Sequence, residues 1–163
     1  MKSKFMSGAY ILAFLVILFT LMGIAFLSLF FFFIANIPVG FIIVVNVFFI
    51  FAWVWLVFGE LRTKVISVDI GYDNFIVKGY FGLGTSKTYY FNDVEGYRTS
   101  ILPASMVVYE YLYVISSGKK VIKLSQFYHK NYEELKATIT GANIKYLGFE
   151  DFSYGRELKE IFI

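Results

Sequence analysis

The sequence predicts an α-helical transmembrane hairpin followed by a small, mainly β domain that ends in one capping helix. Three observations lead to this fold class. The 163 residues are 58% hydrophobic and only 17% charged, which is too apolar for a soluble fold of this length. Positions 5–59 hold no Asp, Glu, Lys, Arg or His. From position 64 onwards, short stretches alternate apolar and polar side chains, which is typical of β-strands. A wholly soluble protein is therefore excluded.

The uncharged amino-terminal stretch is long enough for two membrane-spanning helices. About 50 apolar residues are roughly twice what one helix needs to cross the hydrocarbon core, so the chain must turn back on itself. We expect the turn at 35–40, because Asn36, Pro38 and Gly40 are poor residues for a helix interior. This predicts helices at about 9–34 and 39–59, and residues 1–60 form a transmembrane anchor.

The cations that flank the two helices predict their orientation. Lys2 and Lys4 precede the first helix and Arg62 and Lys64 follow the second, whereas the connecting turn has no cation. By the positive-inside rule, both termini lie in the cytoplasm and the turn lies outside. The aromatic residues expected to anchor the helices at this same interface are Tyr10, Trp53 and Trp55.

Only one strongly polar residue, Asn46, lies deep in either expected span. We expect its amide to make a hydrogen bond between the helices, worth about 1 kcal/mol. Ionisable groups, which would point to an ion or substrate pathway, are missing from both spans. The hairpin is therefore expected to serve packing and oligomerisation rather than to form a pore.

The remaining two thirds of the sequence predict a small β domain. The alternating stretches are separated by short turns rich in Gly, Asn, Asp and Ser, and the stretch 101–106, which contains Pro103, is expected to be a loop. Six strands in regular succession favour an antiparallel meander or a small barrel. The expected strands are 65–70, 75–81, 87–91, 94–99, 107–116 and 120–124.

One helix is expected after the strands. Asn131 followed by Glu134 has the form of a capping box, and Gly141 is a natural helix stop. Three apolar residues on one helix face would cover the sheet: Tyr132, Leu135 and Ile139. The extension 142–163 is expected to hold a short strand near 144–147 and an amphipathic helix at about 154–163, packed on the barrel.

Five segments of the domain resemble the bacterial pleckstrin-homology-like (PH-like) domains, many of which are joined to transmembrane hairpins. These segments are Val65–Val68, Phe75–Gly79, Tyr90–Gly96, Gly118–Leu124 and Asn131–Leu135. The resemblance implies a PH-like barrel over 61–141, serving as a binding scaffold at the inner (cytoplasmic) membrane of a bacterium. The family fold has seven strands where the sequence indicates six. Some PH domains bind phosphoinositides through a basic first turn, but here that turn contains Asp73, so this property is not carried over.

A set of basic residues is the first candidate site. Two interpretations are open: a solvated sheet surface, or contacts with anionic head groups worth about 1 kcal/mol per lysine that reaches the bilayer. Arg62 and Lys64 are closest to the membrane along the chain. The set is Arg62, Lys64, Lys78, Lys87, Lys119, Lys120 and Lys123.

A row of tyrosines is the second candidate site. Tyr109, Tyr111 and Tyr113 share one face of the strand 107–116, and Leu158 and Phe162 lie near the end of the sequence. Tyrosine supplies contact area at protein interfaces, so these residues could bind a partner. The alternative is that the row packs beneath the carboxy-terminal extension, which would dock on the barrel.

Composition and residue types exclude several functions. Cys is absent and His129 is the only histidine, so neither a thiolate or histidine metal site nor a Ser-His-Asp triad is expected. Of the 15 basic residues, only Lys2 and Lys4 precede position 60, so 13 basic and 12 acidic residues lie at positions 60–163. A nucleic-acid-binding domain would need a clear excess of basic residues. Neither a cofactor nor a small-molecule substrate is indicated.

Three hypotheses remain. The first is a non-catalytic module that holds a protein partner, or a copy of itself, at the membrane. The second is a sensor of anionic lipids that uses the basic set, and the third is an auxiliary subunit of a transporter or channel that works through the hairpin.

Overall fold

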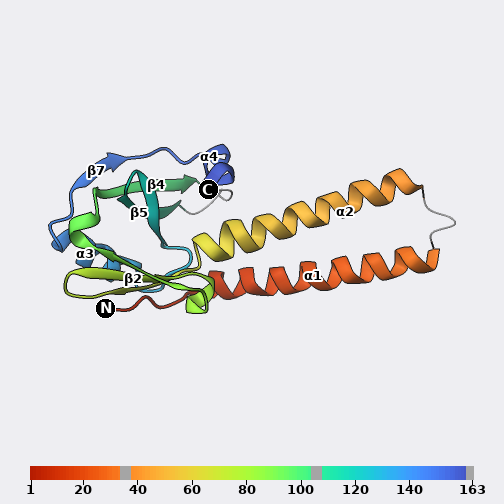
Figure 1. Cartoon of the computed structure of the whole chain (residues 1–163), viewed down its shortest axis with the longest axis horizontal. Helices are drawn as coiled ribbons and strands as arrows, with labels where there is room; N and C mark the ends of the chain where they lie inside the picture. Colours follow the sequence, from red (N-terminus) through yellow and green to blue (C-terminus); the bar gives the residue numbers. More distant parts are fainter. Residues whose placement is uncertain (34–37, 104–107, 161–163) are drawn as a thin grey trace.

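Two long helices project side by side from one end of a β-rich domain (Figure 1). The computed structural model describes residues 1–33, 38–103 and 108–160. Helix α1 covers Ser7–Phe33 and α2 covers Val39–Val54, close to the predicted helices. Half of the expected turn, 35–37, lies outside the described residues. Residues 2–6 and the β domain lie at the same end of this hairpin.

Both helices are long and apolar enough to cross a membrane, over Ser7–Ser28 and Val39–Leu61. In each, only 6% of the most apolar stretch is buried, so the apolar side chains face away from the protein. This arrangement is compatible with a membrane anchor, because side chains of this kind are stable in lipid.

The second helix changes its winding before it meets the domain. After Val54 it continues as a π-helix, η2, over Trp55–Leu61. Such segments are rare, are mostly single turns, and are frequent at functional sites. Glu60 lies in this segment, where its side chain reaches into the domain.

The contacts between the helices differ from the prediction for Asn46. Its side-chain amide donates a hydrogen bond to the carbonyl of Ile42 in its own helix (2.9 Å), because that carbonyl lies one turn earlier on the same face. The hydrogen bond between the helices comes instead from the indole N–H of Trp53, which donates to the hydroxyl of Thr20 (3.1 Å).

The expected interface aromatics lie at the domain end of the hairpin. Tyr10 is exposed, and its ring centroid is 5.6 Å from that of Phe81 in the domain. Trp53 is partly exposed, and Trp55 is half-buried beside Glu60. Their role at a bilayer surface stays a prediction.

The domain contains two separate sheets. The first has the order β1-β2-β3 and is antiparallel; the second has the order β6-β5-β4-β7, with β7 parallel to β4. Among the described residues, strand pairing does not join the two sheets into a closed barrel. The strands are β1 Ser67–Ile70, β2 Asn74–Lys78, β3 Ser86–Tyr90, β4 Gly96–Pro103, β5 Val108–Ser116, β6 Lys119–Ser125 and β7 Tyr146–Phe149.

The ends of most strands are shifted by one or two residues from the predicted ranges, and two strands differ by more. Strand β2 ends at Lys78, because Tyr80 and Phe81 adopt positive φ angles (51° and 58°) in the 3-10 turn η3, Tyr80–Gly82. Bulky residues rarely adopt this conformation, and here the ring of Phe81 packs 4.9 Å from that of Phe5. Strand β4 runs on to Pro103, into the stretch expected to be a loop; 104–107 lie outside the described residues.

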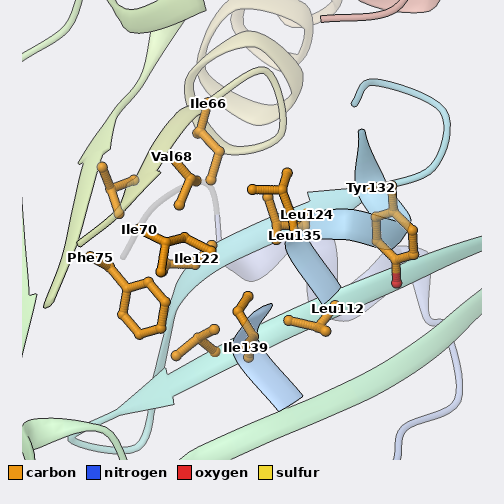
Figure 2. Packing of buried hydrophobic residues seen from close by; sticks show 12 residues of the cluster. Ile66, Val68, Ile70, Phe75, Leu112, Ile122, Leu124, Tyr132, Leu135 and Ile139 are labelled. Carbon is orange, nitrogen blue, oxygen red and sulfur yellow. The ribbon is translucent and has the colours of Figure 1, made fainter. Parts of the chain in front are cut away.

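Helix α3, Tyr132–Gly141, packs with both sheets around the main core (Figure 2). Leu135 and Ile139 are buried on its inner face, as predicted, and the helix ends at the predicted Gly141. Fully burying each such side chain contributes about 1.5–3 kcal/mol. The core residues labelled in Figure 2 are Ile66, Val68, Ile70, Phe75, Leu112, Ile122, Leu124, Tyr132, Leu135 and Ile139.

Residues 2–6 extend the β structure, which the sequence did not predict. Lys2 bridges to Asp69 in β1, and Phe5 bridges to His129 after β6. The N–H of Ser3 donates to the carbonyl of Val68 (2.8 Å). This segment therefore links the sheet edge at β1 to the chain that follows β6.

Asn131 holds this segment and does not cap α3. Its side chain makes no capping hydrogen bond. Its Oδ1 accepts from the N–H of Lys4 (2.7 Å), and its Nδ2 donates to the carbonyl of Lys2 (3.1 Å). The capping box is therefore wrong, because the Asn131 amide is used by a segment more than a hundred residues away.

The base of the hairpin packs directly on the domain. Ala9 and Leu12 of α1 form a second apolar cluster with Val65 and Tyr128. A Cβ at Gly8 would lie 2.6 Å from the carbonyl oxygen of Phe127, so helix and domain touch at the backbone. The domain is therefore fixed to the hairpin and is not carried on a loose linker.

Candidate functional site: a basic cleft and a buried ion network

A cleft of about 770 Å³ lies in the domain beside strands β3 and β6. Each of these strands is the edge of its sheet. Its lining includes Arg62 and Thr63, directly after η2, and Gly118 in the turn before β6. Two carboxylates, Glu95 and Glu150, line it together with six cations: Arg62, Lys87, Arg98, Lys119, Lys120 and Lys123.

The structure gathers most of the predicted basic set around this cleft, but not all of it. Lys78 is exposed at the end of β2, outside the cleft lining, and Lys64 is buried elsewhere. Arg98 was not predicted, although it lies on the expected strand 94–99. Whether a side chain on this strand lines the cleft or lies on the outer surface depends on the strand face that it occupies. The sequence does not show which face borders the cleft.

Two of the three cations on β6 are already engaged by the carboxy-terminal extension. The ammonium of Lys120 donates to Glu150 (2.8 Å) and lies 4.2 Å from the centre of the Tyr113 ring. The ammonium of Lys123 is 3.5 Å from Glu157. Burial alone would raise the pKa of Glu150, but hydrogen bonds from Lys120 and Arg98 outweigh burial and lower this pKa.

Lys64 lies inside the protein, where it could not contact head groups as expected. It is only 6% exposed, and its ammonium is 2.7 Å from Glu60 and 3.3 Å from Glu157. Burial disfavours the charged ammonium, yet the two carboxylates outweigh burial and raise the pKa of Lys64. Lys64 therefore joins η2 to the last helix, α4 (Tyr154–Glu160). Arg62, in contrast, remains exposed.

A smaller cavity of about 290 Å³ adjoins this ion network. Its polar wall includes Glu60, Lys64 and Glu157, and Trp55 lies on the side of the membrane helix. The hydroxyl of Tyr128 donates to Glu60 (2.9 Å), and burial is the main reason that the pKa of Tyr128 is raised. Buried charges are costly unless paired, and here each carboxylate has a donor.

The tyrosine row is covered by the carboxy-terminal extension. Tyr111 and Tyr113 are each 2% exposed, and the ring of Phe152 lies 6.2 Å from that of Tyr111. The row thus packs beneath the extension, which is one of the two interpretations of the sequence, and it is not an open partner surface. Tyr109 is half-buried with its ring 5.0 Å from that of Phe127. Leu158 is half-buried, and Phe162 lies outside the described residues.

His129 is a buried structural residue. Its Nδ1 accepts from the N–H of Ser125 (3.2 Å), which leaves Nε2 to donate to the carbonyl of Ile66 (3.0 Å). Burial lowers the pKa of His129, so the ring is neutral near pH 7. Within the described ranges, no group of three or more His, Cys, Asp or Glu could hold a metal ion.

Comparisons with known proteins add no name to this geometry. The chain matches no protein-family model, and neither a curated protein nor a solved structure is detectably similar to it. The cleft and its ion pairs are therefore the features of the molecule that point to a function.

Proposed function

We propose that the chain is a non-catalytic, PH-like module that binds an acidic segment of a partner protein at the cytoplasmic face of a bacterial inner membrane, with both termini in the cytoplasm. The observation that carries the proposal is the gathering of six cations and only two carboxylates around one cleft. Complementary charge of this kind attracts acidic partners and disfavours basic ones.

The shape of the cleft favours an extended segment over a single anion. Lys119, Lys120 and Lys123 are spread along β6, which rises about 3.3 Å per residue, so one phosphate group cannot contact all three. Strands β3 and β6 each have one side that no described strand occupies. Edge strands of this kind bind extended peptides through main-chain hydrogen bonds. The partner segment would therefore satisfy both the backbone edge and the lysines.

The anchor would act by tethering. It confines the module to the membrane surface, which raises the effective concentration of the cleft for any partner held there. The direct contact between Gly8 and Phe127 supports a fixed orientation of the cleft, since helix and domain cannot swing independently.

Anionic lipid head groups are the second candidate ligand. Arg62 favours them, because it is exposed and directly follows the second helix at one end of the cleft. A cation that reaches the surface gains about 1 kcal/mol there. This candidate is one outcome of the test below.

The test measures peptide binding to the full chain in nanodiscs of zwitterionic lipid. The probe is a short fluorescent peptide in which Glu alternates with Thr. Lys87 and Lys119 are exposed cleft residues, and the variant Lys87→Gln/Lys119→Gln is expected to weaken binding about tenfold, since each exposed pair is worth up to about 1 kcal/mol. Added salt should weaken binding to the unaltered chain.

A matched variant controls for net charge. Lys78 and Lys130 are also exposed but do not line the cleft, so Lys78→Gln/Lys130→Gln should change the Kd by less than about twofold. Equal losses in the two variants would overturn the cleft as the binding site. If the peptide does not bind, while nanodiscs containing anionic lipid protect Lys87 and Lys119 from acylation, the lipid candidate replaces the protein partner.

A further inference from the structure

The carboxy-terminal segment 146–160, here called the strap, already occupies part of the basic cleft with its own carboxylates. Glu150 pairs with Lys120 (2.8 Å) and Arg98 (3.3 Å), and Glu157 is 3.5 Å from Lys123. Three of the six cleft cations thus contact an acidic segment of the same chain. The proposed partner would supply carboxylates of the same kind to these cations.

The strap also covers an aromatic face that would be unstable in water. Beneath it lie Tyr111, Tyr113 and Ile115, all buried, with Phe152 of the strap beside Tyr111. If the strap left, this face would need another cover, because exposed apolar patches of this kind act as interaction sites. A replacement segment therefore needs an aromatic side chain near its carboxylates, as in Phe149-Glu150-Asp151-Phe152.

The strap is held by few strong contacts. Strand β7 pairs with β4 at only two positions, with an irregularity between them. Tyr146, Phe149 and Tyr154 are each at least half exposed. Because these three side chains bury little of their own surface, the strap can open locally at these positions at a small cost compared with global unfolding. The ion pairs with Lys120 and Lys123 thus contribute much of its attachment, and these are the contacts for which an anionic ligand competes.

We propose that the face formed by Tyr111, Tyr113, Lys120 and Lys123 is the docking surface for an acidic, aromatic segment of a partner, and that the strap is its internal occupant and competitor. This inference rests on the proposed function and specifies its partner and its regulation. When the partner displaces the strap, Glu157 also leaves Lys64, so the ion network at η2 loses one carboxylate. Binding is thereby sensed at the exit of the second membrane helix.

A reversible lock tests the proposal in the full chain. Thr99 and Phe149 are register partners in β4 and β7, and the chain has no Cys, so Thr99→Cys/Phe149→Cys places the only two thiols at a bridging distance. The probe is a labelled synthetic peptide of sequence 146–160. Oxidation should weaken binding of the peptide about tenfold or more, and reduction should restore it, because the peptide cannot displace a strap that is joined covalently to β4. The reduced form of the same molecule controls for folding.

A second variant loosens the strap without changing the docking surface. Glu150→Gln removes the carboxylate that holds Lys120 and should tighten peptide binding about fivefold, since one ion pair is worth about 1 kcal/mol. Asp151→Asn makes the same charge change at an exposed neighbour and should alter the Kd by less than about twofold. Hydrogen exchange of 146–160 should be faster in Glu150→Gln even without peptide.

The outcomes separate this inference from the proposed function. If the Glu-Thr peptide binds and depends on Lys87 and Lys119, but locking the strap leaves binding of both peptides unchanged, the strap inference is overturned and the proposed function stands. If neither peptide binds the reduced or the Glu150→Gln protein, both are overturned.

Discussion

The two faces of the four-stranded sheet are both buried, but by different means. On one face, Leu112, Val114, Ile122 and Leu124 are fully buried against α3 and the other sheet. On the other face, Tyr111 and Tyr113 are covered by the strap, whose carboxylates reach Lys120 and Lys123. Water and its solutes cannot replace the apolar packing on the first face. The carboxylates that cover the second face can be replaced by another anion. Two sheet faces that are equally buried can therefore differ in how readily their covering segment is displaced.

The largest effect is expected from a cavity on the core face. Leu112→Ala should lower the free energy of unfolding by about 2–5 kcal/mol, because the site is fully buried and cannot collapse easily. Leu83 is 89% exposed, and Leu83→Ala should cost less than about 0.5 kcal/mol. Denaturant unfolding of the full chain in detergent measures both. Similar values for the two variants would show that the core face is not the main source of stability.

Mild acid should weaken the core side before the strap side. The pKa of His129 is lowered by burial, so below about pH 6.5 the unfolded chain binds a proton that the folded chain resists. The free energy of unfolding should therefore be level above pH 7 and fall by up to about 1.4 kcal/mol per pH unit below 6.5. Thermal unfolding between pH 7.5 and 5 follows this.

Two controls sharpen the pH prediction. His129→Gln should flatten the slope, whatever its effect on the absolute stability. The pKa of Glu150 lies below its ordinary value of 4.5, so its pairs with Lys120 and Arg98 persist over this range. An unchanged slope in His129→Gln would show that another group controls the response.

The smallest effect is expected on the strap face. Phe152→Ala removes the ring beside Tyr111 and should cost about 1 kcal/mol, seen as faster hydrogen exchange within 146–160 and little change in the core amides. Phe149→Ala provides the matched control, because Phe149 is more than half exposed. If core amides were to exchange faster as well, the strap and the core would form one cooperative unit.

Local sequence patterns predict most of the elements. The hydrophobic runs give α1 and α2, alternation gives six strands with shifted ends, and Gly141 ends α3. The short strand expected near 144–147 corresponds to β7. Features that depend on distant partners are missed. Residues 2–6 carry no strand pattern of their own and pair only because β1 and Asn131 present hydrogen-bonding groups. The separation into two sheets also depends on a distant partner, because β7, far along the chain, pairs with β4.

The candidate site shows the same limit. Five of the predicted cations line the cleft, because lysines on neighbouring strands are readily brought together. Lys64 was expected at the bilayer since it directly follows the second helix, but Glu157, far along the chain, draws it inside. The sequence shows that the tyrosines share one strand face, but it leaves open whether this face is covered or binds a partner. The position of the strap decides this.

The pairing of residues 2–6 with the chain after β6 has a consequence for biosynthesis. These residues are made before the helices, but Tyr128 and Asn131, which accept hydrogen bonds from Met6 and Lys4, follow after both apolar helices and six strands. At ribosomal speeds this delay is on the order of ten seconds. If only one of the two helices crossed a bilayer, residues 2–6 would lie on the opposite side from the β domain and could not pair with β1 or with the chain after β6. The pairing of residues 2–6 therefore requires that both helices, or neither of them, cross a bilayer.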